Sequence, residues 1–225
     1  MNIQNLILII IAVLNFFVAL VIILRNSKSR INWSFGLLLF SVVGWCLTLA
    51  FSNSINDYVA VLFWSRATYY FSTIIAVFLV YFSLVFPYQS HLNKKQKIFI
   101  SLPLIMILLI LIKGNLLITG VIDKEWGYDV EFDSLWYILY SVYFFSFMIW
   151  SFINIWNKLK SATGHFQFQL RSILIGSLIA VGFGILFNLI LPYFGIWSLN
   201  WLGPYFTITV LFIITYLIFY KPKAD

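Results

Sequence analysis

The sequence predicts an all-α membrane protein: a bundle of seven transmembrane helices with a small extracellular β-hairpin between the fourth and the fifth helix. Its 225 residues are 63% hydrophobic and only 9% charged, whereas soluble domains carry about 25% charged residues. The apolar residues form runs of the length that a bilayer requires, and basic residues cluster in alternate connections between those runs. No segment is low in complexity, so we expect a single domain over residues 1–225.

Seven apolar runs define the predicted helices. No basic segment precedes the first run and no small-residue cleavage site follows it before Arg25, so we expect it to remain as a membrane helix. The fourth run is short for a hydrocarbon core of roughly 30 Å, but it can extend through Lys113, whose long side chain can reach the interface. The predicted helices are Ile3–Leu24, Trp33–Ser52, Val59–Phe86, Ile98–Ile112, Leu135–Trp156, Leu170–Leu191 and Gly203–Tyr220.

The distribution of charge predicts the orientation. Short cytoplasmic loops accumulate Lys and Arg, and eleven of the 14 basic residues lie at the first, third and fifth connections or in the C-terminal tail. We therefore expect a plasma-membrane protein with its N-terminus outside and its C-terminus in the cytoplasm. The basic residues form no stripe with interleaved aromatic residues, so we expect no nucleic-acid partner. The eleven are Arg25, Lys28, Arg30, Lys94, Lys95, Lys97, Lys158, Lys160, Arg171, Lys221 and Lys223.

The long outer connection before the fifth helix has a period of two. From Trp126 to Asp133, aromatic or apolar side chains alternate with glycine and acidic residues, which is typical of a β-strand. The preceding segment, Leu116–Ile122, can pair with it across Asp123–Glu125. The sequence therefore predicts a hairpin that forms a lid over the outer end of the bundle.

Aromatic residues supply 20% of the chain, and many lie near predicted helix ends. We interpret most of them as an interfacial belt. The alternative is that some line a cavity that faces outward. The residues in question include Trp33, Trp64, Trp136, Tyr137, Trp156, Trp197, Trp201 and Tyr220.

Arg66 is the one charged residue well inside a predicted span, and no acidic residue lies in any span. An ionised residue near the bilayer centre costs roughly 2.5–3.5 kcal/mol, so such residues usually face the protein interior. One interpretation is a structural clamp, in which Arg66 binds backbone carbonyls and tyrosine hydroxyls. The other is an anchor for an anionic or polar headgroup of a ligand, with Tyr69 and Tyr70 sharing the polar site.

Two amides and a repeat of small residues suggest contacts inside the bundle. Asn15 and Asn188 lie in the first and sixth predicted helices, where interhelical hydrogen bonds are the expected role and ligand contact is the alternative. In the sixth helix Gly176, Ala180 and Gly184 repeat every four residues, a spacing that allows close approach of a neighbouring helix.

The cytoplasmic start of the sixth predicted helix is polar. Gln167, Gln169 and Arg171 lie there. They are either an ordinary polar helix start on the basic side of the membrane or part of a surface that couples the bundle to a partner.

The sequence offers little for catalysis, so we expect no enzyme and no cofactor or metal. Cys46 is the only cysteine, and neither His91 nor His165 has a carboxylate or cysteine near it that would complete a metal site or a triad. Nucleotide, lipase and zinc-protease motifs are absent, and the spans lack the acidic residues typical of ion-coupled transport. The seventh helix has no Lys, which excludes retinal attachment as in microbial rhodopsins.

Over nearly its whole length the chain resembles the seven-helix N-terminal sensor region of bacterial histidine kinases and some diguanylate cyclases. The strongest match is Phe168–Gly176. The other matching features are Trp45, the span from Phe63 to Pro87 with its Phe63-Trp64-Ser65-Arg66 start, the outer loop before the fifth helix, Leu191–Gly195, Leu202–Pro204 and Tyr216.

The resemblance implies a receptor module whose last helix passes a signal to a cytoplasmic output domain. Here the sequence ends at Lys221–Asp225 without a phosphoacceptor region or an ATP-binding domain, so no kinase activity is expected. Two classes of function stay open. One is a sensor that binds a small external or lipophilic signal and relays it to a cytoplasmic partner. The other is a non-signalling membrane component, such as a transporter accessory or an assembly factor.

Overall fold

The computed structural model describes residues 3–112, 116–124 and 127–220. It confirms the predicted fold class, a helical bundle with one antiparallel hairpin. Among the described residues, six helical segments are long and apolar enough to cross a membrane, and α4 takes the place of the predicted fourth span. The helices are α1 (Ile3–Arg25), α2 (Arg30–Ser52), α3 (Tyr58–Val85), α4 (Lys94–Ile112), α5 (Ser134–Ser161), α6 (Gly164–Ile185), α7 (Leu191–Tyr193) and α8 (Leu202–Thr215).

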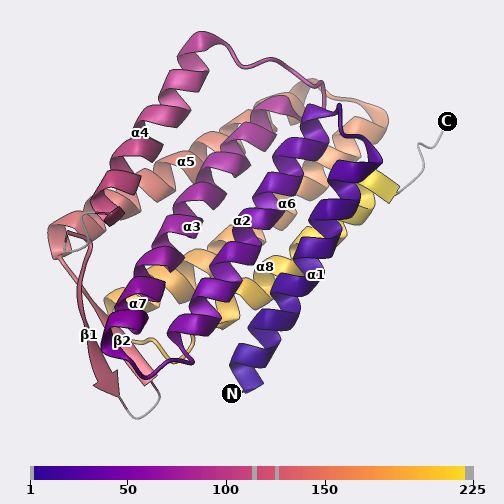
Figure 1. Ribbon diagram of the computed structural model, residues 1–225. Coiled ribbons are helices and arrows are strands. Elements are labelled where there is room, and N and C mark those ends of the chain that lie inside the picture. The colour runs from indigo at the N-terminus through magenta and orange to yellow at the C-terminus, as the bar shows by residue number, and fades with distance from the viewer. Residues whose placement is uncertain (1–2, 113–115, 125–126, 221–225) are drawn as a thin grey trace.

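Six of these helices form a ring around a common core (Figure 1). α1 packs on α2, α2 on α3, α3 on α5, α5 on α6 and α6 on α8, while α8 returns to α1. α4 stands beside this ring and packs on α3. α1 begins and α8 ends at opposite ends of the bundle. We call the end that carries the hairpin the hairpin end, and the opposite end the far end.

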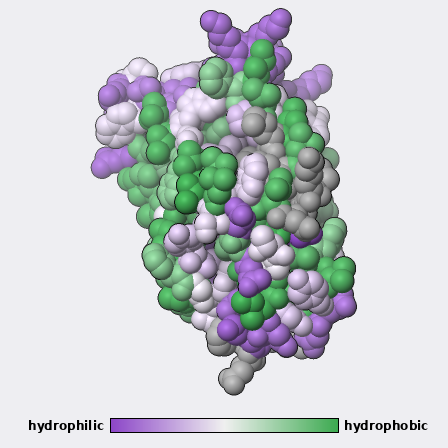
Figure 2. Space-filling view, turned by 90° about the vertical axis from the view of Figure 1, so that its left-hand side faces the viewer, coloured by the Kyte–Doolittle hydropathy of each residue, from purple (hydrophilic) through white to green (hydrophobic). Residues whose placement is uncertain are grey.

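Apolar side chains cover much of the outside of the ring. Large residues that would avoid water are exposed, such as Ile10, Phe17 and Ile149. Figure 2 shows hydrophobic residues through the middle of one face and hydrophilic residues gathered at its two ends. Because so much exposed apolar surface suits lipid and not water, the bilayer is the solvent of the ring.

Short-range polar contacts fix where the helices begin. The carboxylates of Asp57 and Asp133 accept hydrogen bonds from backbone N–H groups in the first turns of α3 and α5, at 2.8 Å for Ala60 N and 3.0 Å for Leu135 N. At α4, Asn93 and Gln96 exchange side-chain and backbone hydrogen bonds in a capping box. At α3 and α5 the helix starts one residue before the predicted start, and at α4 it starts four residues before it.

Lys158 closes the far end of α3. Its ammonium group donates hydrogen bonds to the backbone oxygens of Ser83, Leu84 and Phe86 at 2.9, 2.7 and 2.5 Å. The last carbonyls of a helix have no partner within the helix, and they carry the negative end of its dipole. Lys158 of α5 therefore holds α3 and α5 together at this end.

The hairpin consists of β1 (Ile118–Lys124) and β2 (Gly127–Phe132), which confirms the predicted pair of strands. β1 runs further than predicted, because Asp123 and Lys124 pair with Tyr128 and Gly127. The connection at residues 125–126 lies outside the described residues. The hydroxyl of Tyr128 donates to the backbone oxygen of Asn56 at 2.8 Å, which ties the hairpin to the connection between α2 and α3.

Two π-helical turns interrupt or end the helices of the second half. η1 (Leu186–Ile190) joins α6 to the short α7, and η2 (Tyr216–Tyr220) ends the last span. The hydropathy pattern predicted one continuous helix at each place. A π turn inserts one extra residue into the helical ladder, and such turns are frequent at functional sites.

Candidate ligand-binding site

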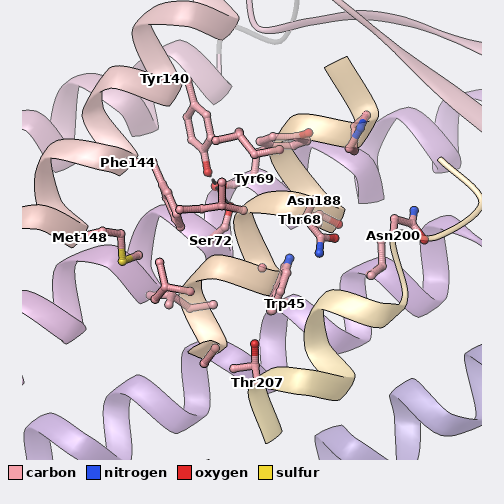
Figure 3. Close-up of a pocket in the computed structure, with 18 of the residues that line it drawn as sticks. Trp45, Thr68, Tyr69, Ser72, Tyr140, Phe144, Met148, Asn188, Asn200 and Thr207 are labelled. Carbon is pink, nitrogen blue, oxygen red and sulfur yellow. Dashed lines mark hydrogen bonds between the residues drawn. The ribbon is translucent and has the colours of Figure 1, made fainter. Parts of the chain in front are cut away.

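A cavity lies inside the ring near the hairpin end. About 100 Å³ is free for the centre of a water-sized sphere, whereas one water needs roughly 10–15 Å³ by this measure. Figure 3 shows Tyr140, Phe144 and Met148 of α5 on one side of this space and Asn188 and Asn200 on the other. The wall is completed by α2, α3, α6, η1, α7, the connection after α7 and α8, through Trp45, Leu49, Thr68, Tyr69, Ser72, Ile75, Ala180, Val181, Gly184, Ile185, Leu189, Pro192, Trp197 and Thr207.

The described residues that line this cavity include no Asp, Glu, Lys, Arg or His. Several of the polar groups already have partners within the wall. Ser72 and Tyr140 share a hydrogen bond of 2.6 Å between their hydroxyl oxygens, and the hydroxyl of Thr68 donates to its own helix. Any molecule held here therefore meets an uncharged and mostly apolar wall.

Asn188, in the π turn η1, differs from these groups. Its amide nitrogen Nδ2 is buried and has no hydrogen-bond partner among the described residues. The amide lies against α8: a Cβ placed on Gly203 would be 1.8 Å from Nδ2 and 3.1 Å from Cγ of Asn188. A buried donor without an acceptor costs roughly 1–3 kcal/mol. Nδ2 therefore faces Gly203 and is closed to a water-sized sphere, so a bound molecule could offer it an oxygen only if the amide turned from α8 toward the cavity.

Tyr137 of α5 supports the same π turn. Its hydroxyl donates to the backbone oxygen of Leu189 at 2.5 Å. Tyr137 is 3% exposed and Trp197 8% exposed, so these two residues are buried in the bundle and are not part of an interfacial belt. Of these two, Trp197 lines the cavity, which is the alternative that the sequence left open.

Phe132, the last residue of β2, joins the hairpin to the cavity. Its ring packs on Tyr69 at 5.5 Å, on Tyr137 at 4.2 Å and on Trp197 at 5.5 Å between ring centroids. Tyr69 and Trp197 line the cavity. The hairpin thus contacts the wall through Phe132.

Gly184 contributes space to the cavity. It lines the wall, and a Cβ placed on it would meet no other atom within 4 Å. The repeat of small residues predicted close helix packing, but at Gly184 the missing side chain leaves room inside the ring. Asn15 also differs from its expected role, because its amide donates to the backbone oxygen of Ile11 in its own helix at 2.9 Å and not to a neighbouring helix.

The predicted ligand residues separate into two groups. Tyr69 and Asn188 line the cavity, whereas Arg66 and Tyr70 are not among the described residues of its wall. The guanidinium of Arg66 donates to the backbone oxygen of Ile118, the first residue of β1, at 3.1 Å. A bond of this kind is what a structural clamp would make. Whether Arg66 also anchors a ligand stays a prediction.

A second, smaller cavity adjoins the first toward the far end. About 50 Å³ is free there by the same measure. Ile75, Ala180, Val181 and Thr207 line both spaces. The remaining residues of the second wall are Phe35, Leu38, Val42, Leu79, Phe82, Ile173, Ser177, Leu211 and Ile214.

At the far end, the two residues predicted to couple the bundle to a partner lie in different surroundings. Gln169 is buried, and its amide donates to the backbone oxygen of Leu217 in η2 at 2.9 Å. Arg171 is exposed. The guanidinium of Arg25, at the end of α1, donates to the backbone oxygen of Phe219, also in η2. Two side chains from neighbouring helices thus bind the last turn of the last span.

Sequence reasoning missed several residues of the site. Tyr140, Phe144 and Met148 of α5 follow one another at intervals of four residues, the spacing that places side chains on one helix face, and this pattern could have been read as a shared wall. Trp45 and Thr207 carry no pattern that separates them from ordinary core residues. The free donor of Asn188 and the open space at Gly184 depend on how several helices meet.

The fold and the cavity define a multi-pass helical membrane protein with an uncharged internal site. A family model described as the N-terminal 7TM region of histidine kinase matches residues 7–221. The chain belongs to this family, which is the membrane sensor region of such kinases, and this confirms the resemblance drawn from its motifs. A search of curated proteins found no match.

Proposed function

We propose that the chain is a membrane-embedded sensor module that binds a small external or lipophilic signal in the cavity and relays it to a cytoplasmic partner. One observation carries the proposal: the cavity wall contains a buried amide donor, Asn188, that has no partner among the described residues. Membership of the histidine kinase 7TM family supports the sensor class.

The relay we propose runs through the last span. Near the cavity, Gly203 of α8 lies against the amide of Asn188, and Thr207 lines the wall. At the far end, Gln169 and Arg25 bind carbonyls of η2. Leu217 is fourteen residues beyond Gly203, which is roughly 21 Å along a helix. A ligand that moves α8 by an ångström or two would therefore change how η2 fits between α1 and α6.

The proposal also includes an orientation in the membrane, which rests on the basic residues. We place the hairpin end outside and the far end in the cytoplasm, because the basic loops of the far end belong on the cytoplasmic side. Lys94, Lys97 and Lys158 are three of these basic residues. A signal from outside or from the outer leaflet then reaches the cavity, and η2 faces the partner.

A screen of small amphiphiles on the chain in phosphatidylcholine nanodiscs tests the proposed site. Gly184→Leu fills the cavity at a position where a new side chain meets open space, and Gly182→Leu is the matched control, exposed and outside the wall. We expect compounds that raise the melting temperature of the parent and of Gly182→Leu but not of Gly184→Leu. If every stabilising compound acts equally on both variants, the cavity is not the site.

A further inference from the structure

We propose that the cavity takes an uncharged amphiphile with a single apolar chain, whose headgroup oxygen accepts a hydrogen bond from Asn188 and whose tail extends toward the far end. This inference rests on the proposed function and names the class of its ligand. Three features carry it: the free donor, the uncharged wall and the second cavity.

The donor selects the chemistry of the headgroup. Asn188 Nδ2 is buried against Gly203 without a partner among the described residues. If the amide turns toward the cavity, an oxygen with a free lone pair removes the cost of its burial. Ester, carbonyl, hydroxyl and ether oxygens all meet this requirement. A purely apolar molecule does not, and would leave the donor unsatisfied.

The wall selects against charge. A carboxylate or an ammonium group that entered this cavity would lose its hydration. The described lining residues offer no opposite charge to replace it. Arg66 lies in α3, two residues before the lining residue Thr68. It donates to the backbone of β1 and is not part of this wall. The site therefore favours an uncharged headgroup over an anionic one of the same size.

The second cavity defines the tail. Its wall is apolar apart from the hydroxyls of Ser177 and Thr207, and both donate to backbone oxygens of their own helices. From Thr68 to Phe82, the two walls follow α3 for fourteen residues, roughly 21 Å. The two free spaces, about 100 and about 50 Å³, follow one another along α3 and share four lining residues. A slender unbranched chain fits such a path better than a ring system.

Photo-crosslinking tests the inference with defined probes. The chain is placed in phosphatidylcholine nanodiscs with a monoacylglycerol that carries a diazirine in its acyl chain, or with an alkyl sulfonate that carries the same diazirine chain and stays ionised. Intact-protein mass spectrometry measures the labelled fraction, and peptide mapping finds the position. Unlabelled monoacylglycerol separates saturable labelling from labelling at the lipid-facing surface.

We expect saturable labelling by the monoacylglycerol at residues of the second wall, such as Leu79 and Leu211. Gly184→Leu should reduce it at least tenfold and Gly182→Leu should leave it unchanged. Asn188→Leu removes the donor and should weaken competition by unlabelled monoacylglycerol about tenfold. Gel filtration and circular dichroism check that each variant folds.

Two results separate this inference from the proposed function. If the sulfonate labels the same wall as strongly as the monoacylglycerol, or if Asn188→Leu has no effect, the cavity remains the site but the ligand class is wrong. If both probes label only lipid-facing residues, equally in Gly184→Leu and Gly182→Leu, the cavity binds no amphiphile and both proposals fail.

Discussion

The amide of Asn188 occupies the place where a side chain at residue 203 would begin. A Cβ on Gly203 would lie 1.8 Å from Nδ2 of Asn188 and 3.4 Å from Cη2 of Trp45. This contact joins the π turn η1 to the start of α8 directly beside the cavity. The contact with Asn188 leaves no room for a side chain at residue 203. Packing alone is therefore a reason for glycine at this position, whatever its backbone conformation.

Gly203→Ala should lower the melting temperature of the chain in nanodiscs. The new methyl group must displace Asn188, and overpacking of this kind costs about 1–3 kcal/mol. Gly182→Ala is the control, because a Cβ there meets open space and alanine favours a helix by roughly 1 kcal/mol over glycine. A melting temperature of Gly203→Ala equal to or above that of Gly182→Ala would contradict the packing of Asn188 on α8.

Arg66→Gln should destabilise the chain without any ligand, because it removes the bond from Arg66 to the backbone oxygen of Ile118. Hydrogen bonds of charged groups contribute about 1.5–3 kcal/mol. Arg66→Lys keeps the charge but not the planar fork, and should recover part of the stability. A normal melting temperature of Arg66→Gln, combined with lost stabilisation by a ligand, would support the anchor over the clamp.

Lys158→Met should lower stability more than Lys160→Met. Lys158 donates to three carbonyls at the end of α3, whereas Lys160 is exposed and lies 5.6 Å from the ring of Trp156. We expect a loss of roughly 1–3 kcal/mol for Lys158→Met, since the carbonyls lose a charged donor. Chemical denaturation in detergent measures both variants, and equal midpoints would show that the Lys158 contact adds no stability.

The orientation is testable with reporter fusions. Fusions after Lys97 and Lys160 should report the cytoplasm, and a fusion after Asp129 should report the outside. The reason is the excess of basic residues at the connections that hold Lys97 and Lys160. A cytoplasmic signal from the Asp129 fusion would overturn the orientation.

The sequence was sufficient to predict the spans and the hairpin, because both depend on local patterns. Apolar runs long enough for a bilayer became helices, and the alternation around Val130 became β2. Helix starts moved outward, at α4 to Lys94 behind the capping box of Asn93 and Gln96, and at α6 to Gly164 without a side-chain cap. An apolar run alone underestimates the length of a helix whose ends lie in the polar interface.

The cavity could be predicted only in part. Asn188 was recognised as a buried amide and Tyr69 as a polar neighbour of Arg66, and both line the space. The π turn at Asn188 and the empty volume beside Gly184 arise from the way several helices meet. The sequence pattern of one helix does not predict them. Likewise, the sequence placed Gln169 at a candidate coupling surface but could not show that it binds η2.

Gln169 offers a direct way to examine the relay, because its amide is one of two donors from neighbouring helices to carbonyls of η2. If α8 carries the signal, filling the cavity near Gly203 should alter the fit of η2 roughly 21 Å away. Gly184→Leu serves as a permanent occupant of the cavity, and Gly182→Leu as the control. Gln169→Leu indicates how far η2 loosens when one donor is lost.

The decisive measurement is hydrogen–deuterium exchange of the backbone amides of η2 in nanodiscs. We predict that Gly184→Leu changes the exchange rate of η2 at least about threefold relative to the parent, a shift in opening free energy of roughly 0.6 kcal/mol. Gly182→Leu should match the parent, and Gln169→Leu should exchange faster. If Gly184→Leu exchanges like the parent while Gln169→Leu responds, the cavity is not coupled to η2 and the account of this chain as a relay is contradicted.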